Sequence, residues 1–124
     1  MESIYEGVAR RARAELGVSA WGMQVMTLPP NWDGHPNHSH DASTEEAGQE
    51  EVYIPLAGSA TLVADEETYE LEPGMMVRVG PDQKRQIQPG GEGIRFVALG
   101  GVPGRAFEPS AWTEHGGPVP VPQQ

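Results

Sequence analysis

The sequence predicts an all-β domain, a sandwich or a small barrel built from short strands. Its 16 glycines and 12 prolines are too many for a helical bundle and suit strands joined by tight turns. Short β-rich runs alternate with such turn signals through the middle of the chain. The 124 residues are enough for one domain with a core, and the absence of cysteine excludes a disulfide framework and thiolate catalysis.

One helix is expected, at the N-terminus, over residues 3–16. Ser3 and Glu6 have the spacing of a capping box, in which both side chains satisfy amides of the first helical turn. Gly17 suits the position just after a helix end. A thin apolar stripe recurs every fourth residue, at Ile4, Val8, Ala12 and Leu16.

Seven strands are expected after this helix. Gly58-Ser59 predicts a hairpin turn, and Pro89-Gly90-Gly91 predicts a break between the last two strands. Short strands with turns at regular intervals are typical of a sandwich or a small barrel. The expected strands span residues 18–28, 52–56, 60–64, 68–71, 75–79, 85–88 and 94–99.

The chain therefore divides into three parts: an N-terminal helix over 1–17, a barrel over 18–102 and a tail over 103–124. The tail is rich in Pro and Gly, which predicts an extended or disordered segment. Residues 41–50 are polar with few apolar anchors, and we expect them to form a mobile loop over the mouth of the barrel.

The formal net charge of −10 limits the partners of the protein. Nucleic acid and anionic membranes both require a basic face, so neither is an expected partner. The first residues lack the basic-then-apolar order of a signal peptide, and no apolar run approaches the ~20 residues of a membrane span. We therefore expect a soluble cytoplasmic protein.

Three of the four histidines, His35, His38 and His40, lie close together. In an extended segment His38 and His40 project to the same side, which suits a metal ion or a shared anion. The alternative is a pair of solvated loop residues. His35 is either a substitute ligand from the same loop or a solvated side chain.

A longer pattern favours the metal. His38-x-His40 followed by the segment 51–58, EVYIPLAG, resembles the first motif of the cupin superfamily, and 71–74, LEPG, resembles the opening of the second. The resemblance covers roughly residues 18–102. It implies a cupin-type double-stranded β-helix that holds a divalent transition metal, Fe, Mn, Ni or Zn, through His38, His40 and Glu51.

Two features depart from that pattern. Ten residues, 41–50, separate His40 from Glu51, more than is usual in the family. Arg85 stands where the family places its last histidine ligand, and a guanidinium has no lone pair for a metal. Three interpretations of Arg85 stay open: it binds an anionic group of a ligand, it pairs with Glu51 in place of a metal, or it points into solvent.

Three functions follow from these alternatives. The first is a metal-dependent enzyme acting on a small molecule, of oxygenase or isomerase type. The second is a non-catalytic binding or sensing module without metal, and the third is a structural dimer whose site has decayed. In the first two, Arg85 and Tyr53 are candidate contacts to a small, anionic ligand.

Two further expectations concern packing. Trp21, Tyr53 and Phe96 are predicted core aromatics, with Tyr53 also lining the ligand site. Open sheet edges of a small barrel are commonly covered by another chain, which predicts a homodimer with two-fold symmetry.

Overall fold

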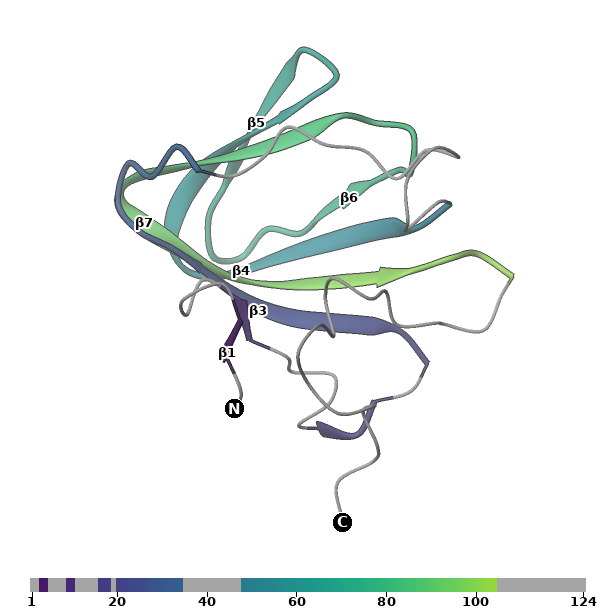
Figure 1. Ribbon diagram of the computed structural model, residues 1–124. Helices are drawn as coiled ribbons and strands as arrows, with labels where there is room; N and C mark the ends of the chain where they lie inside the picture. The colour runs from purple at the N-terminus through teal and green to yellow at the C-terminus, as the bar shows by residue number, and fades with distance from the viewer. Residues whose placement is uncertain (1–2, 5–8, 11–15, 19, 35–47, 105–124) are drawn as a thin grey trace.

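The computed structural model describes residues 3–4, 9–10, 16–18, 20–34 and 48–104. These residues form one antiparallel sheet of seven strands that curls over on itself (Figure 1). The strand order is β1-β2-β3-β7-β4-β5, and β6 pairs with β4 beside β5. The predicted all-β class is confirmed.

The strand bounds are β1 Ser3–Ile4, β2 Ala9–Arg10, β3 Gly22–Leu28, β4 Glu50–Ala64, β5 Glu67–Leu71, β6 Val77–Val79 and β7 Arg85–Gly101. The two longest, β4 and β7, pair along their whole length, from Glu50 opposite Gly101 to Ala64 opposite Arg85. Both bend midway, so the β4–β5 end of the sheet comes to lie over the β3 end (Figure 1).

The predicted hairpin turn at Gly58-Ser59 and the predicted break at 89–91 are both wrong, because each lies inside a continuous strand. The glycines mark β-bulges, where the pairing of β4 with β7 shifts register between Pro55 and Ala60. Gly58 has a φ of 73°, and a Cβ there would lie 2.1 Å from the carbonyl oxygen of Gly93. Only glycine permits this close approach, which bends the sheet instead of ending the strand.

The core fills the space between the two facing halves of the sheet. Leu62, Leu71 and Ile87 from the upper half meet Leu28 and Phe96 from the lower half, and all are buried. Tyr53 and Phe96 pack edge to face with ring centroids 5.5 Å apart, so both are core aromatics as predicted. Trp21 is not, because it precedes β3 and is 46% exposed.

The N-terminal expectation of a helix over 3–16 is not met where the structure describes this segment. Ser3–Ile4 pairs with Ala9–Arg10, which in turn pairs with Val25 and Met26 of β3. The edge of β3 offers backbone partners that a weakly apolar helix lacks, so tertiary pairing overrides the local capping signal. The rest of 3–16 lies outside the described residues, apart from Leu16.

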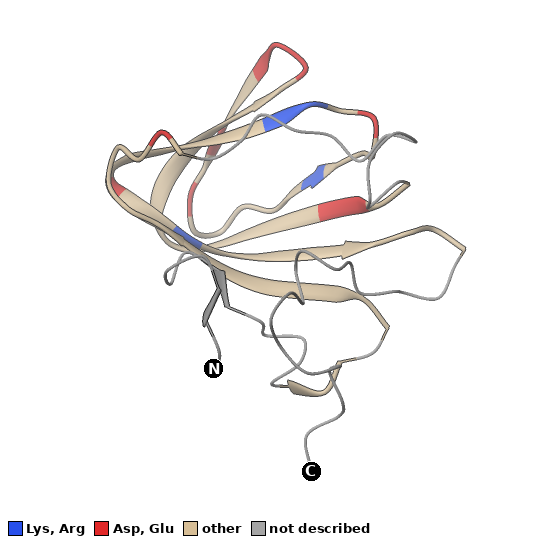
Figure 2. Ribbon diagram, viewed as in Figure 1, with Lys and Arg blue, Asp and Glu red and all other residues tan. Residues whose placement is uncertain are grey.

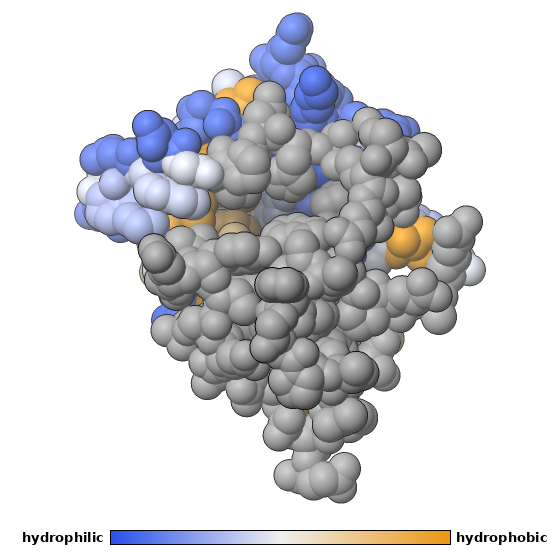
Figure 3. All heavy atoms as spheres, viewed as in Figure 1, coloured by the Kyte–Doolittle hydropathy of each residue, from blue (hydrophilic) through white to orange (hydrophobic). Residues whose placement is uncertain are grey.

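Charged residues gather at two places on the sheet. Acidic residues crowd the β4–β5 hairpin, whose surface is hydrophilic (Figures 2 and 3), and Asp65, Glu66 and Glu67 are exposed there. Basic residues on β6 and at the start of β7 lie across from acidic residues at the start of β4 (Figure 2). Within the described part of the chain, no helix is long and apolar enough to cross a membrane.

The bulge geometry predicts a large effect of one methyl group. Gly58→Ala should lower the free energy of unfolding by about 2 kcal/mol or more, because it combines a left-handed backbone with a direct clash. Gly91→Ala is the matched control, since a Cβ there meets nothing within 4 Å. The control should change stability by less than about 1 kcal/mol in urea denaturation. Equal midpoints for both variants would contradict the role assigned to Gly58.

Candidate functional site at the interior end of the sheet

The start of β4 places two polar side chains on the inner face of the sheet. Side chains of a strand alternate between faces, and Tyr53 is in the core, so Glu51 shares its face. The neighbouring residue Glu50 points outward and pairs with Arg78 of β6 at 2.7 Å. Adjacent glutamates therefore serve different surfaces, and only Glu51 faces the interior.

Arg85 reaches the same place from the other half of the sheet. It is the first residue of β7 and pairs with Ala64, whose side chain is buried in the core. The alternation of β7 therefore turns the guanidinium inward, and no part of Arg85 is exposed. An outward orientation into solvent is excluded.

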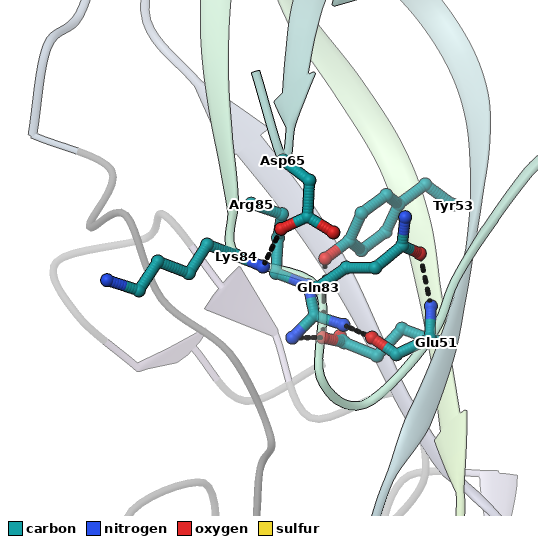
Figure 4. Close-up of polar contacts among 7 residues, drawn as sticks. Glu51, Tyr53, Asp65, Gln83, Lys84 and Arg85 are labelled. Carbon is teal, nitrogen blue, oxygen red and sulfur yellow. Dashed lines mark hydrogen bonds and ion pairs between the residues drawn. The ribbon is translucent and has the colours of Figure 1, made fainter. Parts of the chain in front are cut away.

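Hydrogen bonds hold the chain around Arg85 in position. The amide of Asp65 donates to the Lys84 carbonyl and the amide of Lys84 donates to Asp65 Oδ1, each at 3.0 Å. In the preceding loop, the Gly80 amide donates to Gln83 Oε1 at 2.8 Å. These bonds tie the loop before β7 to itself and to the β4–β5 hairpin (Figure 4).

Glu51, Tyr53 and Arg85 converge (Figure 4). Arg85 Nη2 donates to the Gly80 carbonyl at 2.7 Å, and Nη1 lies 3.8 Å from Glu51 Oε1. The Tyr53 hydroxyl donates to the same Glu51 oxygen at 3.3 Å. The structure thus supports the pairing of Arg85 with Glu51 that the sequence left open.

The pairing leaves the guanidinium incompletely satisfied. Arg85 Nε and Nη1 are buried and have no hydrogen-bond partner among the described residues. The 3.8 Å between Nη1 and Glu51 Oε1 exceeds hydrogen-bond distance. A buried donor without an acceptor costs about 1–3 kcal/mol, and more when it is charged. Such a group is retained when water, an ion or a ligand satisfies it. Arg85 Nε and Nη1 are therefore available to donate hydrogen bonds to an acceptor atom of a water, an ion or a ligand.

Glycines border Glu51 within its row of the sheet. Glu51 lies opposite Gly100, and Gly100 lies opposite Gly22, so these three residues share the inner face. A Cβ at Gly100 would stand 2.7 Å from Gln49 Nε2, so the Gln49 amide lies over the glycine. On its other side Glu51 lies opposite Val79 of β6, whose side chain is buried in the core.

The predicted metal site can be followed only in part. Glu51 is in the interior as expected, whereas His35, His38 and His40 lie outside the described residues, as does the predicted mobile loop up to residue 47. Among the residues that are described, no three His, Asp or Glu side chains gather to hold a metal. Glu51 already faces a buried guanidinium, which would repel a second cation nearby. The described residues alone therefore do not form a metal centre, and the predicted set of His38, His40 and Glu51 stays a prediction.

Sequence reasoning missed the neutral members of the site. Counting back by two from Glu51 along an extended chain would have placed Gln49 on the inner face. The local sequence does not indicate that Gly80, Gln83 and Gly100 belong to the site. Loop geometry brings the first two there, and strand register brings Gly100.

Comparisons with known proteins identify the fold. No family model and no curated protein matches the sequence. A cupin protein from Bacteroides fragilis is similar in structure, with a TM-score of 0.64 and 24% identity over 89% of each chain. The cupin_2 domain of an XRE family transcriptional regulator from Enterobacter cloacae has a TM-score of 0.63 and 18% identity, over 77% of this chain and 96% of that domain.

A larger enzyme shares the architecture. A sugar phosphate isomerase of the cupin superfamily from Silicibacter pomeroyi matches with a TM-score of 0.64 and 20% identity. The match covers 82% of this chain but 59% of the isomerase. This chain therefore spans less than two thirds of that protein.

The contacts of Arg85 predict a non-additive pair of substitutions. Glu51→Gln should destabilise the protein by on the order of 3 kcal/mol, because it removes the only carboxylate that faces the buried cation among the described residues. Adding Arg85→Met should recover part of that loss, since the double variant has no buried charge. Urea denaturation of the single and double variants measures the coupling.

Glu50→Gln is the matched control for this cycle. It breaks an ion pair on the same strand whose side chains are 35% and 62% exposed. Exposed pairs contribute about 1 kcal/mol or less, so this variant should stay close to the parent. Strict additivity of Glu51→Gln and Arg85→Met would show that the two side chains do not interact.

Proposed function

Because the chain has the fold of the cupin superfamily, we propose that it binds a small molecule inside the barrel through an anionic group that Arg85 recognises. The observation that carries the proposal is the buried guanidinium, two of whose nitrogens lack acceptors in the part of the chain that the structure describes. A carboxylate or phosphate supplies several acceptor oxygens, and Arg is suited to bind them through more than one donor. Binding of this kind needs no metal.

The accessibility of the two charged residues indicates the direction of entry. The Glu51 side chain is 15% exposed, whereas Arg85 is fully covered. A ligand arriving from solvent therefore meets Glu51 first and the guanidinium behind it. Tyr53, whose hydroxyl contacts Glu51, is the second candidate ligand contact.

Anion binding is tested with probes of known charge. Inorganic phosphate, propanoate and glucose 6-phosphate should raise the melting temperature of the protein, and neutral glucose should not. The sugar phosphate is included because one structural neighbour is described as a sugar phosphate isomerase. Arg85→Met should weaken binding of the anions at least ~10-fold, since a charge-assisted hydrogen bond contributes about 1.5–3 kcal/mol.

Arg78→Met is the control for this experiment. Arg78 is a cation of the neighbouring strand β6 that points outward, with a side chain 62% exposed. Its removal changes the net charge equally but should leave anion affinity unchanged. If both variants lose affinity alike, binding reflects general charge and the proposed site is wrong.

A metal-bound form is the second candidate function. The His38-x-His40 pattern and the inward position of Glu51 favour it, and these three residues would be the ligands of a divalent transition metal. When bound, such a metal supplies Lewis acidity and open positions for a small molecule, as an oxygenase or isomerase-type activity requires. Arg85 disfavours metal binding, because its positive charge lies beside Glu51 and would repel the metal ion.

Substituting Arg85 decides between the two candidates. In the metal-bound form, Arg85→His removes the repelling charge and adds a ligand, so affinity for Zn²⁺ or Mn²⁺ should rise at least ~10-fold, and His40→Ala should abolish it. Calorimetric titration of the two variants and the parent, purified without chelator, measures these affinities. No metal binding by the parent, together with anion binding that requires Arg85, would reject the metal-bound form.

A further inference from the structure

We propose that two copies of this chain pack against each other through the outer face of β3 and of the parts of β4 and β7 that lie beside it. The sequence predicts a homodimer through open sheet edges, whereas this proposal places the contact on one face of the sheet. That face points away from the core, so the proposal does not depend on ligand binding at Arg85.

The strands in this half of the sheet carry apolar side chains on both faces. Tyr53 and Phe96 point into the core, so the alternation of side chains turns their neighbours outward. Strand pairing sets these neighbours side by side in two rows, and none of them belongs to the core cluster. The apolar outer face consists of Met23, Val25, Val52, Ile54, Val97 and Leu99.

The other half of β4 and β7 has a different outer surface. Its outward side chains on β7 are Gln86 and Gln88, and Thr61 of β4 lies opposite Gln88 and bonds to Glu70 of β5 at 3.1 Å. Val63, opposite Gln86, is the apolar exception. The same two strands are therefore largely polar on the outside in one half and apolar in the other. Apolar side chains on both faces are typical of strands that are covered on both faces.

The described strands do not cover the apolar outer face. Five of its side chains are half-buried, and Val25 is 8% exposed. The N-terminal strands β1 and β2 extend the sheet beyond the edge of β3, so they widen this half of the sheet and do not cross its face. Trp21, directly before β3, and Leu56, two residues after Ile54, are 46% and 48% exposed. Large apolar side chains thus remain exposed at both ends of the face.

The distribution of charge favours a second copy as the cover. The chain has a net charge of −10, so two copies repel each other unless their acidic residues lie away from the contact. The charged residues in the outer rows of β3, β4, β6 and β7 are Arg95 and the pair Glu50–Arg78, which meets at 2.7 Å. The acidic β4–β5 hairpin lies in the other half of the sheet (Figure 2). An aliphatic surface beside a neutral ion pair is self-complementary, as a two-fold contact requires.

The size of the surface is compatible with a dimer contact. A stable contact covers about 800 Å² of accessible surface on each partner. Three strands about 4.8 Å apart and about seven residues long offer roughly 350 Å² in flat projection, before the relief of the side chains is added. Thr27 and Arg95 border the apolar rows at one end, and the Glu50–Arg78 pair borders them at the other. An apolar centre with a polar rim is the usual composition of a protein interface.

Sedimentation equilibrium of the full chain tests whether the copies associate. We expect twice the mass of one 13.4 kDa chain at micromolar concentration. Raising NaCl from about 50 to about 500 mM should strengthen the dimer, because salt screens the repulsion between two acidic chains. A single-chain mass at every concentration up to about 100 µM would overturn the proposal, as would a dimer that salt weakens, since opposite charges would then hold it.

Substitutions test whether the apolar outer face is the contact. Val97 lies between Val25 and Ile54, and Val97→Asp should raise the dissociation constant of the dimer at least ~100-fold, because it brings two carboxylates into the interface. Val63→Asp is the matched control, an outward valine in the other half of the sheet, and should change the constant less than ~3-fold. Circular dichroism verifies that each variant is folded.

A conservative pair of variants decides the question if an aspartate variant does not fold. Val97→Thr keeps the branched shape and places a hydroxyl in the interface twice, once from each copy, so it should weaken the dimer at least ~10-fold. Val63→Thr should leave the dimer as strong as that of the parent. Equal dissociation constants for the Val97 and Val63 variants would show that the copies associate through another surface, and the proposal would be wrong.

Discussion

The guanidinium of Arg85 is a full positive charge with no exposed surface, and the arrangement of one end of the molecule follows from it. A charge in the interior is strongly destabilising unless polar groups are brought to it. The Gly80 carbonyl and the Glu51 carboxylate come from different strands and loops, so each must be delivered by its own backbone. The site therefore forms only when the sheet curls over and brings these segments together.

A metal ion and a guanidinium solve the same electrostatic problem by different means. Either can balance the charge of an inward-facing glutamate such as Glu51. A metal offers vacant coordination positions, whereas Arg85 offers directed N–H donors at a fixed reach from β7. The second arrangement favours recognition of acceptor atoms over activation of a bound water, which is why we place anion binding ahead of metal chemistry.

Much of the fold could be predicted from residue patterns, because strand-forming runs and turn residues are local signals. The prediction erred at Gly58 and at 89–91, where glycine and proline mark bulges inside long strands. Turns and bulges use the same residues, and only pairing with a distant strand distinguishes them. The expected helix over 3–16 erred for a similar reason, since the edge of β3 is invisible from the local sequence.

The candidate site was predictable to the extent that it followed alternation along one strand. Glu51 and Tyr53 share a face because they are two residues apart, and a family resemblance singled out Arg85. The orientation of Arg85 depended on a register that its own neighbours do not define, since Lys84 and Arg85 are both cations. The supporting groups from Gly80 and Gly100 required the completed sheet.

The long β4–β7 ladder has a consequence for the order in which the molecule assembles. Arg85 pairs with Ala64 at the end of the ladder nearest in sequence, whereas Glu51 pairs with Gly100 near the far end. If the ladder zips from its near end, Arg85 comes into place before its contact with Glu51 can form. Contacts made after the rate-limiting step leave the folding rate unchanged and slow unfolding. If the contact between Arg85 and Glu51 forms after that step, its removal should speed unfolding and leave the folding rate unchanged.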